Sequence, residues 1–513
     1  MKIISATLGL PHAQAVPRAA FAVAVDGNRI AAVGEDAALR VRFPDAKVEH
    51  FEHALLMPAF VNSHDHGRGL GTASLGIEDS VLETWLFDLW AQPEIDPYLA
   101  AACDGARLLR SGVTLTAHSH NPRDWSKMGA EGEATIRGYR DVGIRVAFHP
   151  VMVDQNRLIY AASPAEEAAF IESLPAALRP VARALGEPPL TLAAYLDLCD
   201  ALYAAYHDAT DHTVHVQISP AGGQWCSDRL ILLATDWAQA RGTRVQMHLL
   251  ETHRQRDYAF RKWGKSFVKH LDEIGALGPW LTLAHMVWVE PDDLLLLAAR
   301  GVAIAHNPSS NLRLRSGIAP LSHMLAAGIA LGIGLDGHAL DDDQDYLREM
   351  RLAWVLANLR DHQPATPGKG LSAGDVLNLG TASGTAVTLG AGCRLGVLVE
   401  GALADLVVLG LDFSMLDLAA RPDHVAPALL HLATRAHVRH VMCNGEWVVR
   451  EGRLTRLDEA ALWAEITSQV RTQSGVQPDD HRATMRQLAD RALQKMAGEK
   501  NSSASGDTEV RDS

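Results

Sequence analysis

Apolar runs rich in β-branched residues recur eight times after residue 57, and stretches with helical spacing separate them. Residues 292–300, with four consecutive leucines among acidic and small residues, are typical of such a helical stretch. The pattern predicts alternating strands and helices, which suit either a closed (β/α)8 TIM-type barrel or a doubly wound open sheet. The eight predicted strands are residues 57–64, 112–120, 143–152, 213–220, 244–251, 281–288, 301–308 and 329–336.

Polar residues stand at the ends of several of these strands, and this favours the barrel. A barrel gathers its active site at the carboxyl ends of all its strands. An open sheet would not bring the ends of strands one, five, six and eight together. We therefore expect an α/β fold in which residues 58–394 form a (β/α)8 barrel.

The two flanks of this region have a different, β-rich pattern. Residues 20–57 contain a pattern typical of a β-hairpin, with its turn at Asp26-Gly27-Asn28. Residues 395–455 again contain short apolar runs typical of strands. We expect residues 1–57 and 395–455 to pair into one small β-sandwich. Residues 456–496 have a helical pattern, and 497–513 are expected to form a disordered tail. The helical insertion at 153–211 is expected to cover the barrel mouth.

Composition narrows the range of partners. The chain has 513 residues, is 48% hydrophobic and 21% charged, and carries a formal net charge of −14, which argues against nucleic acid. Five scattered cysteines without CxxC spacing are expected to be reduced, buried thiols. No secretory signal and no run of 18 apolar residues is found, so we expect a cytoplasmic enzyme without membrane contact. Homo-oligomer formation is left open.

A metal site is predicted from residues at the strand ends. His64 and His66 close the first strand, with both imidazoles on one face. This HxH pair alone is weak evidence, because 24 histidines in this chain give about one HxH by chance, and His118-Ser119-His120 is a second. Convergence is the stronger signal: His248, His285 and Asp336 end strands five, six and eight. Imidazoles and a carboxylate suit Zn, Fe(II), Mn or Co.

Glu251 follows His248 by three residues and would stand above such a metal ion. A carboxylate there can take a proton from bound water and pass it to a leaving group. For any one of these residues, a structural role at a strand end is the alternative interpretation. For all of these residues together, a purely structural role is a weak explanation.

These motifs resemble the amidohydrolase superfamily, in particular its cytosine-deaminase-like branch of aminohydrolases and chlorohydrolases. Residues 56–66 resemble the first strand of that branch, and 248–252 its fifth. Residues 305–320, Ala-His-Asn-Pro-Ser-Ser-Asn-Leu-Arg-Leu-Arg-Ser-Gly-Ile-Ala-Pro, are similar to its long seventh-strand signature. The resemblance covers nearly all of residues 20–455.

The resemblance implies one divalent metal ion, zinc first and Fe, Mn or Co next, because strand four lacks the lysine that bridges two metals. It implies His64, His66, His248 and Asp336 as ligands. It further implies that Glu251 shuttles the proton, that His285 polarises the substrate or steadies the attacking water, and that Asp336 accepts the proton of that water.

Substrate contacts are expected from Trp85, Glu94, His118 and His306. Trp85 would stack on a planar heterocycle and Glu94 would accept a hydrogen bond from a ring N–H, against the alternatives of a core aromatic and a solvated loop charge. Nucleoside deaminases of the branch have a histidine after the strand-four proline, whereas this chain has Pro220-Ala221. That departure argues against an adenosine-type substrate. His338 and the three acids that follow it match no single activity.

The sequence therefore predicts a hydrolase for a small-molecule substrate, acting on carbon–nitrogen bonds other than peptide bonds. The first hypothesis is hydrolytic deamination of an aminated purine, pterin or triazine, with release of ammonia. The alternative is hydrolytic dechlorination, or cleavage of a carbamate, urea or amide, on the same metal site. A third hypothesis is an inactive barrel kept for binding or assembly, in which broken ligands are usual and none is seen here.

Overall fold

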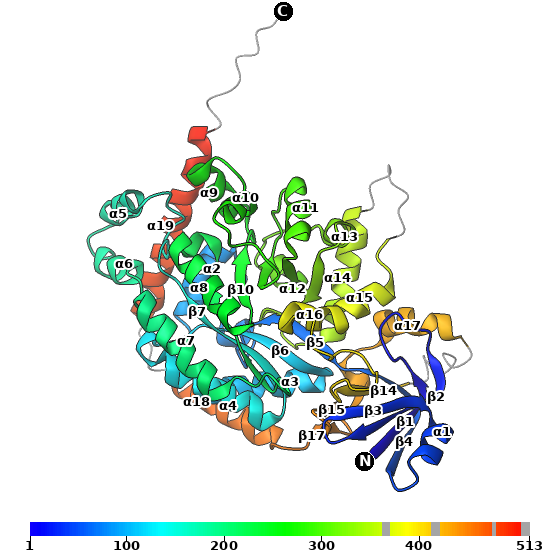
Figure 1. Cartoon of the computed structure of the whole chain (residues 1–513). Helices are drawn as coiled ribbons and strands as arrows, with labels where there is room; N and C mark the ends of the chain where they lie inside the picture. Colours follow the sequence, from blue (N-terminus) through cyan, green and yellow to red (C-terminus); the bar gives the residue numbers. More distant parts are fainter. Residues whose placement is uncertain (362–369, 412–420, 474–478, 504–513) are drawn as a thin grey trace, which may run out of the picture.

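Parallel strands surrounded by helices make up the centre of the computed structural model, which describes residues 1–361, 370–411, 421–473 and 479–503 (Figure 1). The strands lie in two parallel sheets, ordered β5-β6-β7-β8, with β9 beside β7, and β10-β11-β12-β13. Their bounds are β5 Phe60–Asp65, β6 Val113–His120, β7 Arg145–Met152, β8 Val214–Val216, β9 Ser219–Pro220, β10 Val245–Leu249, β11 Leu281–His285, β12 Ala303–His306 and β13 Ala330–Ile333.

Each of the eight predicted strand regions overlaps one of these strands, and the fourth overlaps two short ones, β8 and β9. The first region began too early, because residues up to Pro58 belong to another sheet. The strands are almost fully buried, as expected where helices cover one face and packed side chains cover the other.

Backbone hydrogen bonds join the two parallel sheets at two places, here called the seams, where an edge of one sheet lies beside an edge of the other. At one seam Gln246 N donates to Ile218 O over 3.1 Å. At the other, Asp336 N donates to His64 O over 2.9 Å. The carboxyl end of β5 therefore lies beside the segment that follows β13, and β10 lies beside the segment between β8 and β9.

The flanks form a separate sheet of eight strands in the order β17-β16-β15-β14-β4-β1-β2-β3. Its strands are β1 Lys2–Gly9, β2 Arg18–Asp26, β3 Arg29–Glu35, β4 Lys47–Pro58, β14 Leu406–Gly410, β15 Val438–Cys443, β16 Glu446–Arg450 and β17 Arg453–Leu454. β14 pairs antiparallel with β4, so the N- and C-terminal flanks join as expected. The predicted hairpin is β2–β3, and its turn uses Gly27 with φ +58°.

Nineteen α-helices lie in the described residues. They are α1 Asp36–Arg42, α2 Leu82–Trp90, α3 Pro97–Arg110, α4 Met128–Val142, α5 Pro164–Ser173, α6 Arg179–Gly186, α7 Leu192–Tyr206, α8 Asp228–Arg241, α9 His253–Trp263, α10 Phe267–Glu273, α11 Pro291–Arg300, α12 Pro308–Arg313, α13 Leu321–Ala326, α14 Tyr346–Asp361, α15 Ala373–Leu379, α16 Ala382–Leu389, α17 Val425–Leu432, α18 Glu459–Gln473 and α19 Asp479–Ser503. Several have the sequence signals of helix starts. In α3, for example, Asp96 accepts from Leu99 N over 3.0 Å and Pro97 follows it.

The C-terminal helices return to the parallel-strand region. α18 packs on α3 and α19 on α2, so α19 lies on the side away from the flanking sheet (Figure 1). The predicted tail was expected to begin at residue 497, but α19 continues to Ser503, and residues 504–513 lie outside the described residues.

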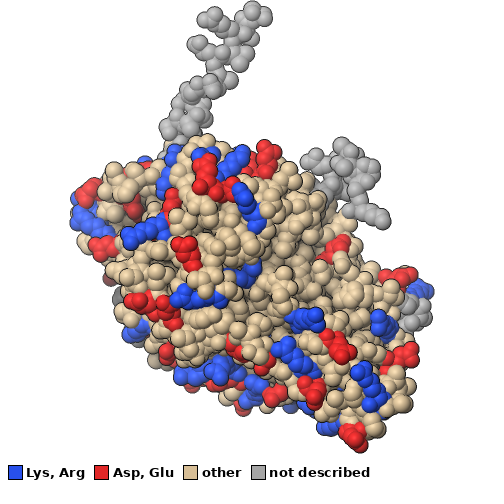
Figure 2. Space-filling view, viewed as in Figure 1, with Lys and Arg blue, Asp and Glu red and all other residues tan. Residues whose placement is uncertain are grey.

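Three expectations about the surface and the cysteines can be compared with the structure. Acidic and basic side chains are interspersed over the face shown in Figure 2. No described helix combines the length and the apolar character needed to cross a bilayer. All five cysteines are free; four are buried, and Cys393 is half-buried.

Candidate metal centre and pocket

Four side chains from three strand ends converge on one point. His64 lies in β5 and His66 directly follows it, His248 lies in β10, and Asp336 follows β13. One ligand atom from each lies within 4.8 Å of the others. The Asp336 Oδ1 atom is 3.1 Å from the Nε2 atoms of both His64 and His66, and the Nε2 atoms of His66 and His248 are 3.2 Å apart. This is the set of ligands that the sequence predicted.

Hydrogen bonds at Nδ1 orient all three rings. The acceptors are Gln246 Oε1 at 2.8 Å for His64, Ser119 O at 3.0 Å for His66, and Ala221 O at 2.6 Å for His248. Because each Nδ1 donates its proton, each Nε2 directs a lone pair at the centre. Such outer contacts fix the tautomer and direction of metal-binding histidines.

The donor set fits a cation. His64 Nε2 and Asp336 Oδ1 are buried 3.1 Å apart, yet neither atom has a hydrogen-bond partner of suitable geometry among the described residues. Lone pairs of His66 and His248 that face each other would repel without a positive charge between them. Burial raises the pKa of Asp336, but His64 and His66 outweigh it and hold the pKa well below the usual value. Burial lowers the pKa of His248 well below its usual value. These directions favour an ionised carboxylate at Asp336 and a neutral imidazole at His248, the forms that bind metals.

His285 and Glu251 lie next to this cluster. His285 Nε2 is 3.7 Å from Asp336 Oδ2 and 3.7 Å from Glu251 Oε2. Its Nδ1 is 2.9 Å from Asn311 Oδ1, and burial lowers the pKa of its ring to about 4, so the ring is neutral near pH 7. Burial, and then the nearby Asp336, raises the pKa of Glu251 well above its usual value.

The backbone is strained where the functional strands end. His285 has φ +75° and Asp336 has φ +58°, in the left-handed region that residues with a Cβ rarely adopt. Strain of this kind costs about 1–3 kcal/mol and persists where the surrounding structure enforces it. Here it places both side chains at the pocket.

A pocket of about 460 Å³ opens over the cluster, within the usual range of about 300–1,000 Å³ for small-molecule sites. Its polar end contains His66, His248, Glu251, His285 and Asp336. The remaining wall is largely apolar and comes from helices, strand ends and loops.

Comparison with known proteins agrees with this geometry, since a pattern of the amidohydrolase family matches residues 55–448. The chain belongs to the amidohydrolase family. The resemblance seen in the motifs is confirmed, and with it the class of hydrolases that act on carbon–nitrogen bonds. A pattern of a bacterial imidazolonepropionase-like composite domain also matches residues 22–46, in the flanking sheet.

Two curated relatives of this chain are deaminases. A 5'-deoxyadenosine deaminase of Methanopyrus kandleri is 30% identical over 429 residues, which cover 82% of this chain and 87% of the relative. A 5-methylthioadenosine/S-adenosylhomocysteine deaminase of Nitratidesulfovibrio vulgaris is 30% identical, with 87% of this chain and 91% of the relative covered.

Solved structures of similar fold include enzymes with bound zinc. An adenosine deaminase of Xanthomonas campestris with bound zinc is 26% identical, with a TM-score of 0.74 over 92% of this chain and 98% of that one. A variant of the atrazine chlorohydrolase of Arthrobacter aurescens, complexed with zinc and atraton, is 24% identical with a TM-score of 0.75, over 92% and 100% of the two chains. The family, these structures and the cluster together support a divalent metal ion in this member.

Two of the four predicted substrate residues line the pocket, namely Trp85 and His118. The Arg68 guanidinium lies 4.9 Å from the centroid of the Trp85 ring. His118 Nδ1 is 3.0 Å from the hydroxyl of Tyr139, which donates to Asp104 over 2.8 Å, so a buried hydrogen-bond chain holds this histidine.

The other two predicted substrate residues do not reach the pocket. Glu94 is exposed in the segment between α2 and α3 and is not part of the lining. His306 is buried in β12, has no hydrogen-bond partner for Nδ1 among the described residues, and is also absent from the lining.

Sequence reasoning missed several lining residues of this family member. Arg68 was overlooked although it follows His66 by two residues, and that spacing was the available signal. Trp225, His481 and Met485 come from distant segments, and no motif marked them. Ala221 also lines the pocket, at the position where the nucleoside deaminases of the resemblance have histidine.

Proposed function

We propose that this chain is a hydrolytic deaminase of an aminated heterocycle and holds one zinc ion with His64, His66, His248 and Asp336. The convergence of these four ligand atoms within 4.8 Å, beside the protonatable Glu251, carries the proposal. Deaminases among the relatives support the reaction class.

The bound ion would supply Lewis-acid activation of water, lowering its pKa from 15.7 toward about 7. Burial raises the pKa of Glu251 well above its usual value, which favours the protonated acid that could deliver a proton to the departing nitrogen. The neutral His285 presents Nε2 between the carboxylates of Glu251 and Asp336, where it can accept a hydrogen bond from the attacking water.

The substrate ring is proposed to lie between the polar end and Trp85, with His118 as a further polar contact. Purine, pterin and triazine rings remain the candidates. The named substrates of the relatives favour an adenosine-type ring, whereas Ala221 in place of histidine favours other rings. The panel of test compounds must therefore contain both types.

We also propose that the two parallel sheets form one closed (β/α)8 barrel over residues 58–394. The seam bonds from Gln246 N to Ile218 O and from Asp336 N to His64 O support this. Residues 1–57 and 395–455 would form the β-sandwich, since Phe21 of β2 and Met442 of β15 share one apolar cluster although three strands separate theirs in the sheet.

The test is a metal analysis of the purified full chain combined with a panel of aminated adenosines, pterins and triazines. We expect one zinc ion per chain and ammonia release that stops after exhaustive chelation and returns with added zinc. Release of chloride or an alkylamine without ammonia would instead favour the alternative reaction. Full activity after chelation would refute the metal-dependent mechanism.

A further inference from the structure

The C-terminal helix α19 contributes to the pocket. His481 and Met485, four residues apart and therefore on one face of this helix, both line it. Their segment lies beyond residue 448, where the match to the amidohydrolase family pattern ends. This part of the pocket wall is thus supplied by a region outside the family match.

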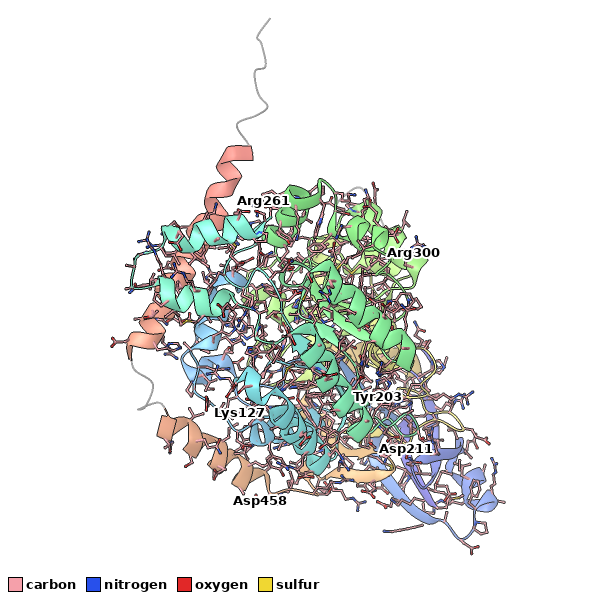
Figure 3. All side chains as sticks on the ribbon, turned by 60° about the vertical axis from the view of Figure 1, so that its left-hand side comes forward. Lys127, Tyr203, Asp211, Arg261, Arg300 and Asp458 are labelled. Atoms are coloured by element: carbon pink, nitrogen blue, oxygen red, sulfur yellow. The ribbon has the colours of Figure 1, made fainter. Side chains whose placement is uncertain are left out.

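Contacts with α2 hold α19 in place. Arg486 Nε lies 3.1 Å from Asp88 Oδ1, on the helix that also provides Trp85. Met485 and Leu488 are buried at 2% and 1% exposure, in the apolar cluster that contains Phe87 of α2. Figure 3 shows α19 on the same side of the molecule as α5 and α6 of the 153–211 insertion. Lys495 lies 3.8 Å from Glu166 of α5.

Apolar side chains from three helices line this part of the pocket. Leu86, Leu89 and Trp90 come from α2, Val181 and Leu185 from α6, and Met485 from α19. The Leu and Val side chains offer no hydrogen bond to a polar substrate group, and the thioether of Met485 is only a weak acceptor. An apolar pocket surface of this kind gains free energy when it binds an apolar group and excludes water.

We propose that α19 forms the outer wall of the substrate site and that the substrate carries an alkyl or aryl substituent, which binds against Met485 and the apolar residues of α2 and α6. This assignment rests on the proposed deaminase function. It narrows the substrate class to aminated heterocycles that carry an apolar substituent.

The experiment uses the full chain and one aminated ring in three forms, unsubstituted, with a small alkyl group and with a benzyl group. Kinetics of ammonia release give kcat and KM. Calorimetry with the corresponding oxo products gives Kd without turnover. The variants are Met485→Ala, which removes the wall, and Met485→Trp, which fills the site. Gln487→Ala, exposed on the same helix, is the control.

In Met485→Ala, KM and Kd for the benzyl compounds are expected to rise about tenfold, the scale of losing hydrophobic contacts in a binding pocket. Values for the unsubstituted ring should stay within about twofold, and kcat should change little. Met485→Trp should exclude the benzyl compounds and keep the unsubstituted ring. The Gln487→Ala control should match the wild type throughout.

Two failures are distinguishable. Binding that depends on the substituent and on residue 485, without ammonia release, would refute the deaminase and keep the role of α19. Affinity that depends on neither the substituent nor residue 485 would overturn the role of α19, whatever the chain hydrolyses.

Discussion

Glu251 carries the proton-transfer step of the proposal, and its replacement by glutamine tests that step at the scale of one residue. The carboxyl lies 3.7 Å from His285 Nε2 and is not one of the four ligands. In Glu251→Gln we expect unchanged zinc content and a kcat lower by about 10²–10⁴-fold, the usual contribution of a positioned acid or base. Metal analysis and ammonia release measure the two effects.

Glu133→Gln, with its carboxylate exposed on α4, is the matched control for this substitution and should retain both zinc and turnover. Wild-type turnover in Glu251→Gln would remove Glu251 from the mechanism. Loss of zinc in Glu251→Gln would mean that the carboxyl supports the metal rather than the reaction.

Single residues were predictable where strand ends fixed their position. His248 lies near the end of β10 and Asp336 shortly after β13, and the ends of parallel strands gather at one edge. His306 also ends a strand, but both faces of β12 are buried, so the sequence does not tell which face meets the pocket. Glu94 lies between two helices, where no periodicity fixes the direction of a side chain.

At the scale of elements, α14 anchors the start of α12 through the buried Glu349. Its carboxyl accepts from Ser309 N over 2.8 Å and also from Ser309 Oγ. The next residue, Ser310, donates to Asp336 Oδ2 over 2.5 Å, so this contact supports a predicted metal ligand. Burial raises the pKa of Glu349 from 4.5 to about 7.

This pKa shift predicts a pH-dependent stability. Between pH 4.5 and 7 the folded chain keeps a proton on Glu349 that the unfolded chain loses. The contribution of Glu349 to the free energy of unfolding therefore falls as the pH rises, by about 1.4 kcal/mol per unit. Glu349→Gln mimics the protonated acid at every pH. Its Tm should be close to that of the wild type at pH 5 and exceed it by a few degrees at pH 8.

Thermal melting of wild type and Glu349→Gln at both pH values checks this, with Glu133→Gln as a control that should show no pH-dependent gain. The Tm difference between Glu349→Gln and the wild type should thus be larger at pH 8 than at pH 5. A variant that melts below the wild type at pH 8, by as much as at pH 5 or by more, would show that Glu349 is ionised in the folded protein.

Helices and strands could be predicted from the sequence where the local pattern of apolar and polar residues determines them. The strand positions followed from β-branched apolar runs, and β2–β3 from its turn. The docking of α19 did not, because its partner α2 lies about 400 residues away and an amphipathic helix does not specify which surface it covers. The position of Met485 in the pocket wall therefore could not be predicted from the sequence.

For the whole molecule, the contact between the parallel-strand region and the flanking sheet contains a buried ion pair. Arg145 of β7 donates to Asp405, just before β14, through Nε over 2.9 Å and Nη2 over 2.8 Å. Both side chains are about 1% exposed, and Asn444 contacts both partners. The sequence predicted that the flanks pair with each other, but it did not predict this link, since 260 positions separate the two charges.

Removing one partner of this pair should cost more than removing both. Asp405→Leu leaves the guanidinium of Arg145 buried without a counter-charge, for which we expect a loss of about 3–5 kcal/mol in the free energy of unfolding. The double variant Arg145→Met with Asp405→Leu replaces the pair by apolar side chains and should recover much of that loss. Denaturant midpoints followed by circular dichroism give the comparison, and zinc content shows whether the metal centre is preserved. A double variant less stable than Asp405→Leu alone would mean that the ion pair itself, rather than relief of an unpaired charge, holds the flanking sheet against β7.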